Sequence, residues 1–183
     1  PTGGASLGNQ QTATYTIVND DIATDPEIEV LDGSTNIADG TVTAINFGTT
    51  TVNSPAIKTF TVKNTGNAAL SLSGMTLPDG FSLVGNLPGS IAAGSDATFQ
   101  VQLNANATGT FNGTLQFTNN DSDENPFDFP ISGTVEPPPT VSITATDAEA
   151  AEVGNNTGTF RLNRTGNTAG ALTVNLAIDA SST

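Results

Sequence analysis

The sequence contains no cysteine, no histidine and no tryptophan, and only four of its 183 residues are lysine or arginine. Without cysteine the chain can form no disulfide, no thiolate metal site and no thiol nucleophile. Without histidine it lacks the usual general base near neutral pH and the commonest ligand of transition metals. An ordinary hydrolase is hard to build from the remaining residues, and we expect this segment to be non-enzymatic.

Positive charge is scarce, whereas negative charge is not. Eighteen acidic residues against four basic ones give a net charge of −14. Such a chain repels phosphate backbones and anionic membrane surfaces, so we expect no nucleic-acid partner and a natural affinity for cations. No apolar run approaches the ~20 residues of a membrane-spanning helix, and we therefore expect no membrane insertion in this segment.

What the chain does have is a composition rich in glycine, threonine, asparagine and serine, which favours β-structure with many turns and almost no helix. The clearest strand is at residues 57–64, where Phe60 and Val62 lie on one face. A turn cluster at 64–67 follows it, and Leu70 and Leu72 begin a second apolar run. This order of strand, turn and strand predicts a β-sandwich.

Apolar residues alternate with polar ones in several other segments. They predict further strands at 27–31, 37–47, 98–103, 111–117 and 127–131. Proline has no backbone N–H, so Pro130 within the last of these predicts an edge strand or a bulge.

The segment FTVKNTGNAAL at 60–70 is the most specific motif of the sequence. It is followed by GFSL, by PGSIAAGSDATF, and by an asparagine, four residues and a closing NPF. This order of motifs resembles the bacterial surface-protein module called choice-of-anchor D, which is similar to the Hydin-like immunoglobulin-type domains. The resemblance covers residues 26–136, and it implies an immunoglobulin-like β-sandwich that serves structure or interaction.

The two flanks resemble another module. TATYTIV at 12–18, followed by an acidic doublet, is similar to the last strand of a Calx-β domain, and the segment from residue 141 onward resembles the first half of one. We therefore expect an all-β chain, an immunoglobulin-like β-sandwich with partial β-sandwich pieces at both ends. The expected order is a Calx-β end at 1–21, a linker at 22–26, the sandwich at 27–136, a proline-rich linker at 137–140 and a Calx-β start at 141–183. The unfinished pieces would be disordered, pair with another molecule, or be completed by sequence outside these residues.

An acidic cluster near the first linker is the strongest chemical signal. Its members are Asp20, Asp21, Asp25, Glu27, Glu29 and Asp32. Carboxylates are hard oxygen ligands and suit calcium, which takes 6–8 oxygens. The Calx-β resemblance implies Asp20 and Asp21 as calcium ligands, with Glu152 and Asp147 as candidates in the second copy. The alternative is a solvated acidic linker without a metal.

A second acidic run, DSDEN at 121–125, resembles the alternating oxygen ligands of an EF-hand loop. It lacks the glycine and the distant glutamate that such a loop requires. A polar hairpin is therefore favoured over a metal site.

Three functions fit these observations. The first is a non-enzymatic structural or adhesive segment of a large modular extracellular bacterial protein, a spacer whose junctions calcium stiffens. Its partners would be other β-domains of the same protein or neighbouring copies, or a cell-surface protein or glycan. The second is a peptide- or glycan-binding module that works by β-strand addition, and the third is an accessory immunoglobulin-like domain of a secreted hydrolase.

Overall fold

The computed structural model describes residues 25–149, 154 and 156–177, and Asp20, Asp21 and Glu152 lie outside these residues. The described residues form strands, turns and loops but no helix, so the expected all-β class with an immunoglobulin-like sandwich is confirmed. None of these residues belongs to a helix that is long and apolar enough to cross a membrane.

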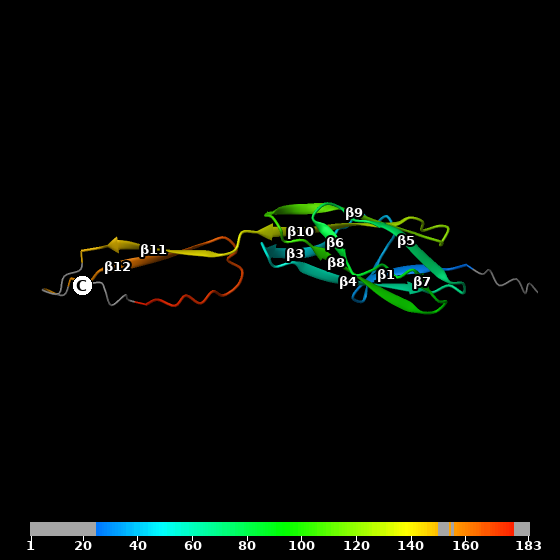
Figure 1. Cartoon of the computed structure of the whole chain (residues 1–183), viewed down its shortest axis with the longest axis horizontal. Coiled ribbons are helices and arrows are strands. Elements are labelled where there is room, and N and C mark those ends of the chain that lie inside the picture. The colour runs from blue at the N-terminus through cyan, green and yellow to red at the C-terminus, as the bar shows by residue number, and fades with distance from the viewer. Residues whose placement is uncertain (1–24, 150–153, 155, 178–183) are drawn as a thin grey trace, which may run out of the picture.

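Two five-stranded sheets make up the sandwich (Figure 1). The first sheet has the order β2-β1-β4-β8-β6, and its strands are β2 (Thr35–Ile37), β1 (Ile28–Asp32), β4 (Ala56–Asn64), β8 (Asp96–Leu103) and β6 (Phe81–Val84). The second has the order β3-β10-β9-β5-β7, and its strands are β3 (Ile45–Thr51), β10 (Phe127–Glu136), β9 (Gly109–Asn119), β5 (Leu70–Thr76) and β7 (Ser90–Ile91). All of the pairings are antiparallel except that of β3 with β10.

Phenylalanine side chains fill the space between the two sheets. Phe60 of β4 lies at their centre, with its ring centroid 5.3 Å from that of Phe99 and 5.4 Å from that of Phe129. Phe117 stacks on Phe127 at 5.6 Å. All five are almost fully buried. The alternation in the sequence therefore predicted the inward faces of these strands correctly, and Ile91 of β7 is buried as well.

The strand expected at 37–47 is wrong, because the chain there changes sheets. β2 ends at Ile37 in the first sheet and β3 begins at Ile45 in the second. The crossing is fixed by Asp39, whose Oδ1 accepts the N–H of Asp128 at 2.7 Å, and by Gly40, whose N–H donates to the Asp128 carbonyl at 2.9 Å. Gly40 has a φ of 61°, which favours glycine over other residues.

The edge or bulge expected at Pro130 is also wrong, because β10 lies inside its sheet between β3 and β9. Pro130 pairs with Thr114 of β9 in regular register. The N–H and the carbonyl of Asp128 both bond to residues 39–40, on the side away from β9. In a strand the nitrogens of residues two apart point to the same side, so the Pro130 nitrogen also points away from β9. The pairing with β3 begins only at Ile131, and the missing N–H of the proline therefore costs no hydrogen bond to β9.

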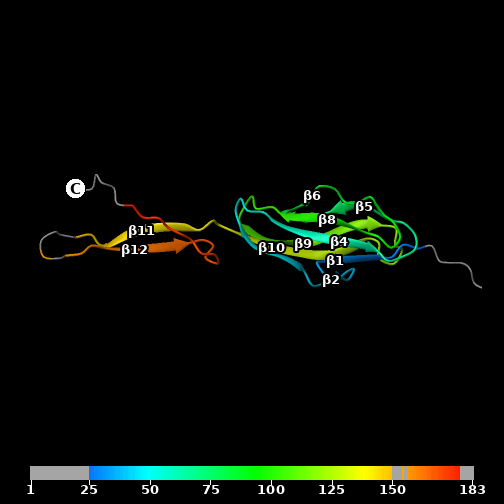
Figure 2. The ribbon, with the colours of Figure 1, turned by 90° about the horizontal axis from the view of Figure 1, so that it is seen from below.

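Beyond the sandwich, β11 (Thr140–Asp147) and β12 (Thr159–Thr165) form an antiparallel hairpin. It extends from the end of the sandwich at which β10 finishes (Figure 2). Residues 171–177, which follow the hairpin, carry no assigned strand.

Candidate functional site

One end of the sandwich gathers polar side chains around the start of β1. Asn64, the last residue of β4, is 1 % exposed, and its side chain makes four hydrogen bonds to the backbone. Its Nδ2 donates to the carbonyls of Ala68 at 2.7 Å and Ile91 at 3.0 Å, and its Oδ1 accepts the N–H groups of Gly66 at 3.1 Å and Glu27 at 3.3 Å. This buried amide therefore joins the turn after β4 to the strand that enters the sandwich.

The loop between β9 and β10 approaches the same point from the other sheet. Asp121 is 2 % exposed, and its Oδ2 accepts the N–H of Ile28 at 2.8 Å. Its own N–H donates to Oδ1 of Asn119 at 2.7 Å, and the Nδ2 of Asn119 donates to the Glu124 carbonyl at 2.7 Å. The Asn119 N–H donates in turn to Oδ1 of Asn125 at 3.1 Å. The loop is thus held by its own asparagine and aspartate side chains.

Three carboxylates meet where the loop and the start of β1 come together. Glu27, Asp121 and Asp123 each offer one oxygen, and these oxygens lie within 4.8 Å of one another. Glu27 and Asp123 are exposed, whereas Asp121 is buried. Among the residues that the structure describes, this is the group whose spacing suits a hard cation, and it supplies three of the 6–8 oxygens that calcium takes.

The pKa of Glu124 is shifted by burial and by the negative charges of this group. The pKa of Glu124 is raised from 4.5 to about 7, first by burial and then by the negative charges of Asp121, Glu27, Asp39 and Asp123, in that order. Its Oε2 is shielded from solvent and has no hydrogen-bond partner. The carboxyl therefore holds a proton at a pH where an exposed glutamate has lost it.

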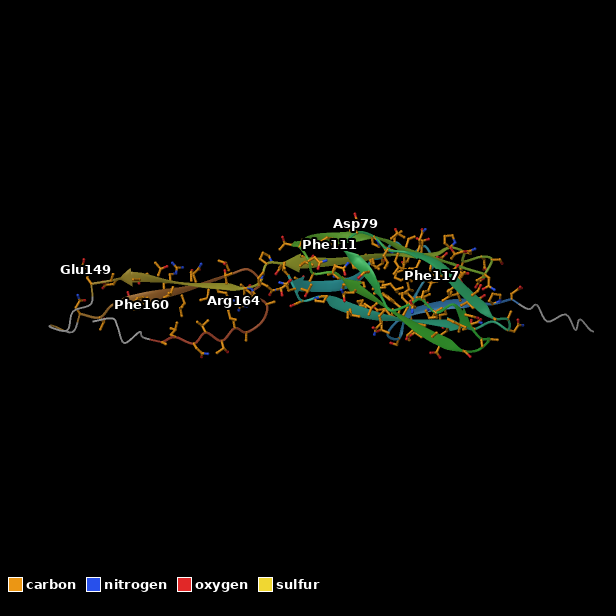
Figure 3. All side chains as sticks on the ribbon, viewed as in Figure 1. Asp79, Phe111, Phe117, Glu149, Phe160 and Arg164 are labelled. Atoms are coloured by element: carbon orange, nitrogen blue, oxygen red, sulfur yellow. The ribbon has the colours of Figure 1, made fainter. Side chains whose placement is uncertain are left out.

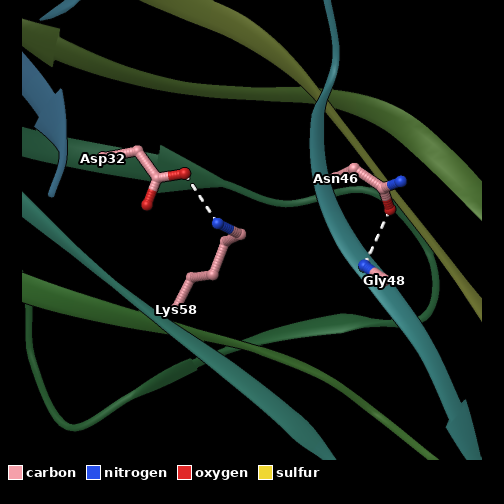
Figure 4. A network of polar contacts seen from close by, with 4 residues as sticks. All are labelled: Asp32, Asn46, Gly48 and Lys58. Carbon is pink, nitrogen blue, oxygen red and sulfur yellow. Dashed lines mark hydrogen bonds and ion pairs between the residues drawn. The ribbon is translucent and has the colours of Figure 1, made fainter. Parts of the chain in front are cut away.

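The acidic cluster expected from the sequence divides in two. Glu29 and Asp32 belong to β1 and pair with the lysines of the neighbouring strand, Lys63 at 3.4 Å and Lys58 at 2.6 Å. Figure 4 shows Asp32 and Lys58 facing each other, and beside them the separate contact in which Asn46 accepts the N–H of Gly48 at 2.7 Å. These two carboxylates form ion pairs between neighbouring strands and are not part of the group that contains Glu27.

Of the metal ligands predicted from the sequence, Asp147 is the one that lies among the described residues. Asp147 ends β11, is exposed, and accepts the N–H of Glu149 at 3.1 Å. Within the described part of the chain it belongs to no group of three carboxylates. Asp20, Asp21 and Glu152 are outside the described residues, so their part in calcium binding stays a prediction.

The sequence analysis treated Glu27 and the run at 121–125 as two separate acidic segments, whereas the structure brings them together. The two are more than 90 residues apart in the chain and meet because the buried Asp121 accepts the Ile28 N–H across the end of the sandwich. The one signal in the sequence was the density of asparagine and aspartate at 119–125, which is typical of a loop that hydrogen-bonds to its own backbone.

A sequence model of one domain family matches residues 39–134, which is more than half of the chain. The chain belongs to the HYDIN/CFA65/VesB-like Ig-like domain family. The Hydin-like part of the expected resemblance is thereby confirmed, whereas the choice-of-anchor D and Calx-β parts stay predictions. Membership in this family of Ig-like domains is compatible with a structural or accessory module. No curated protein matches the chain.

Several solved structures resemble this HYDIN/CFA65/VesB-like domain at low identity. A protein of unknown function from Porphyromonas gingivalis W83 is 13 % identical, with a TM-score of 0.48 over 62 % of this chain and 48 % of its own. The PapD-like domain 7 of human CEP192, an ASH domain, is 11 % identical, with a TM-score of 0.46 over 70 % of this chain and 97 % of its own. The Vibrio cholerae VesB protease is 18 % identical, with a TM-score of 0.38 over 51 % of this chain and 30 % of its own. The chain thus spans about half the length of the first of these proteins.

Proposed function

We propose that this segment is a non-catalytic spacer in a large modular extracellular bacterial protein. The observation that carries the proposal is the position of the two points where the chain enters and leaves the sandwich. The start of β1 lies at the β9–β10 loop, since the Ile28 N–H bonds to Asp121. β10 then runs ten residues away from that loop and ends at Glu136, where the chain leaves (Figures 1 and 2).

A domain that is entered at one end and left at the other extends an array along its own long axis. Ten residues of β-strand span ~33 Å, so one such domain adds about that length between its neighbours. The filled phenylalanine core makes the spacer stiff, because close-packed interiors deform little.

The spacing can be measured directly because the chain has no cysteine of its own. Spin labels at Asp25→Cys and Pro137→Cys, both exposed positions, report the distance between entry and exit by pulsed electron resonance. A single narrow distance distribution of about the length of β10 supports a rigid spacer. A broad distribution under native conditions, similar to that of the same labelled chain in urea, would exclude it.

We propose in addition that calcium stiffens the junction at the entry end. Asp20 and Asp21 precede Glu27 by a few residues, and Glu27 offers a carboxylate oxygen beside those of Asp121 and Asp123. Glu152 and Asp147 stay candidates for the junction at the exit end. Carboxylate-rich groups of this kind bind calcium with affinities that depend on the number of charges and the rigidity of the site.

Calcium titration of the full chain by calorimetry tests this second proposal. The expected result is saturable binding and a higher melting temperature, since a ligand that binds only the folded state stabilises it. The double variant Asp20→Asn/Asp21→Asn and the single variant Asp123→Asn should each weaken binding. Asp79→Asn, an exposed aspartate far from the junction in sequence, is the matched control for lost charge. Equal calcium binding by the unmodified chain and the three variants would mean that the acidic residues form a solvated linker without a calcium site.

A second function is favoured by the family itself, whose description includes VesB. The VesB structure is that of a Vibrio cholerae protease, and on this basis the segment would be an accessory domain beside a secreted catalytic domain. The parent sequence beyond residues 1 and 183 separates the two proposals. Further β-modules there support the spacer, whereas a catalytic domain supports the accessory role.

A further inference from the structure

The sandwich and the β11–β12 hairpin are joined by a short stretch of chain that is rich in proline. β10 ends at Glu136 and β11 begins at Thr140, and Pro137, Pro138 and Pro139 lie between them. In Figures 1 and 2 the hairpin continues outward from the end of the sandwich at which β10 finishes. A junction of this kind bends only through backbone torsions that neither part holds, so its stiffness follows from where the hydrogen bonds of each part stop.

The hydrogen bonds of the sandwich reach the last residue of β10. Glu136 pairs with Thr51 of β3, and its carbonyl accepts the N–H of Val52 at 3.0 Å. The N–H of the following residue, Asn53, donates to the carbonyl of Ala105 at 2.8 Å, which ties this segment to the loop after β8. Because a peptide unit is planar, the bond to the Glu136 carbonyl also orients the next backbone nitrogen relative to the sandwich.

The hydrogen bonds of the hairpin begin at the very next residue. The carbonyl of Pro137 accepts the N–H of Asn167 at 3.3 Å, beyond the first pair of the β11–β12 ladder. Gly166 lies against the same stretch, since a Cβ at this residue would be 2.5 Å from the Pro138 carbonyl oxygen. The chain is therefore part of the hairpin from Pro137 onward, although β11 itself begins at Thr140.

Arg164 of β12 holds the turn that makes this contact. Its Nη2 donates to the carbonyl of Asn167 at 2.8 Å and its Nη1 to the carbonyl of Gly170 at 2.7 Å. Hydrogen bonds from a charged guanidinium are stronger than those between neutral groups. Figure 3 shows Arg164 at the end of the hairpin nearer the sandwich, with Phe160 and Glu149 farther out. The guanidinium group therefore fixes Asn167 where it meets the linker.

The two torsions between these anchors are φ and ψ of Pro137. The pyrrolidine ring of Pro137 locks its φ near about −65°. The ring of Pro138 restricts the ψ of the residue before it to extended values. Neither torsion rotates freely, so the two proline rings set the direction in which the hairpin leaves the sandwich.

We propose that the exit junction is a coupling without a hinge, in which Pro137 and Pro138 hold the hairpin in one direction relative to the sandwich and no metal ion is needed. The proposal rests on the spacer function, and it specifies how the spacer passes its direction to the chain that follows. It also separates the exit junction from the entry junction, where the stiffening was assigned to calcium.

Spin labels at Thr98→Cys on β8 and Thr144→Cys on β11, both exposed positions, measure the distance across the junction by pulsed electron resonance. The full chain is used, in the presence of a calcium chelator. The expected result is a single distance distribution as narrow as that between labels at Thr98→Cys and Thr114→Cys, which both lie in the sandwich. Added calcium should leave the width unchanged.

The variant Pro137→Gly tests the role of the ring. Glycine adopts positive φ about as readily as negative φ, so the distribution across the junction should broaden by roughly twofold or more. Pro139→Gly is the matched control, because residue 139 lies between the bond of Pro137 to Asn167 and the first pair of the hairpin ladder. Its distribution should stay narrow.

The variant Arg164→Met tests the second anchor. It removes both donors to the turn after β12 and should broaden the distribution as well. Arg161→Met, at an exposed position on the same strand, is the control for the lost charge and should leave the width unchanged. Contacts between Ile143 and Leu162 in nuclear magnetic resonance spectra verify that each variant keeps its hairpin, because these residues are paired across the two strands.

Three results would overturn the proposal. A broad distribution across the junction, with a narrow one between labels at residues 25 and 137, would place a hinge at the exit and leave the spacer function intact; broad distributions in both measurements would exclude the spacer as well. A narrow distribution in Pro137→Gly would mean that the proline rings do not set the direction. An unmodified chain without contacts between Ile143 and Leu162 would lack the second anchor altogether.

Discussion

Gly66 approaches the backbone of Asp25 so closely that a Cβ at residue 66 would lie 2.4 Å from the Asp25 carbonyl oxygen. The same Cβ would lie 2.6 Å from the Glu27 nitrogen. Real Cβ atoms do not approach backbone this closely, so the turn after β4 and the entering chain are fitted to each other through the absence of a side chain. This contact fixes the direction from which the chain enters the sandwich.

Replacing Gly66 by alanine should therefore destabilise the domain. We expect a loss of about 1–3 kcal/mol in the free energy of unfolding, because backbone atoms have to shift to admit the methyl group. Urea unfolding followed by circular dichroism measures it. Gly89→Ala is the matched control, since a Cβ there meets nothing within 4 Å. Equal stability of the two variants would show that the entering chain moves aside freely.

Asn64 should be among the most sensitive polar residues of the sandwich. Asn64→Asp replaces an amide that donates to two carbonyls with a carboxylate that cannot donate when ionised, in a place with 1 % exposure. We expect a loss of about 2–4 kcal/mol at neutral pH. Thermal unfolding measures the effect, with the exposed Asn46→Asp as the control. A loss no greater than that of the control would mean that water replaces these hydrogen bonds.

The free energy of unfolding should depend on pH through Glu124, and the direction of the change follows from its raised pKa. The folded state raises the pKa of Glu124 to about 7, so between pH 4.5 and 7 the folded chain holds more protons on this group than the unfolded chain does. The contribution of this group to the free energy of unfolding is therefore complete below pH 4.5 and is lost as the pH rises through about 7.

The variant Glu124→Gln removes this loss. Its stability relative to the unmodified chain should rise across pH 5–7 and stay level above about pH 7.5. Urea unfolding at a series of pH values measures the difference, and Glu149→Gln on the exposed hairpin loop provides the comparison. If the difference does not change with pH, the cluster around Glu124 exerts no electrostatic effect.

Asp32 and Lys58 should be coupled only modestly. Their Oδ2 and Nζ atoms are 2.6 Å apart and both side chains are 27 % exposed, so solvent screens much of the attraction. A double-mutant cycle with Asp32→Asn and Lys58→Met should give about 0.5–1 kcal/mol, decreasing in high salt. A larger coupling that salt does not change would indicate that the pair is effectively buried.

The sequence foresaw the inward side of most strands because burial imposes a period of two that any strand shows. Phe60, Phe99 and Phe129 could be placed in the core from their neighbours alone. The change of sheet at residues 38–44 could not be foreseen, since it depends on Asp39 and Gly40 bonding to Asp128, almost ninety residues away. The prediction of an edge or bulge at Pro130 was wrong for the same reason, because the sequence pattern does not show toward which neighbouring strand the proline nitrogen points.

For the candidate site, the sequence by itself determined the supply of oxygen ligands and the exclusion of sulfur and imidazole chemistry, since composition settles which side chains exist. It also determined which residues along each strand are apolar. Only the tertiary structure decided which carboxylates meet. Glu29 and Asp32 pair with lysines of the adjacent strand, whereas Glu27 joins Asp121 and Asp123 of the β9–β10 loop. The physical reason is that sheet pairing and the closure of the sandwich bring together residues whose separation in the chain carries no information about their distance in space.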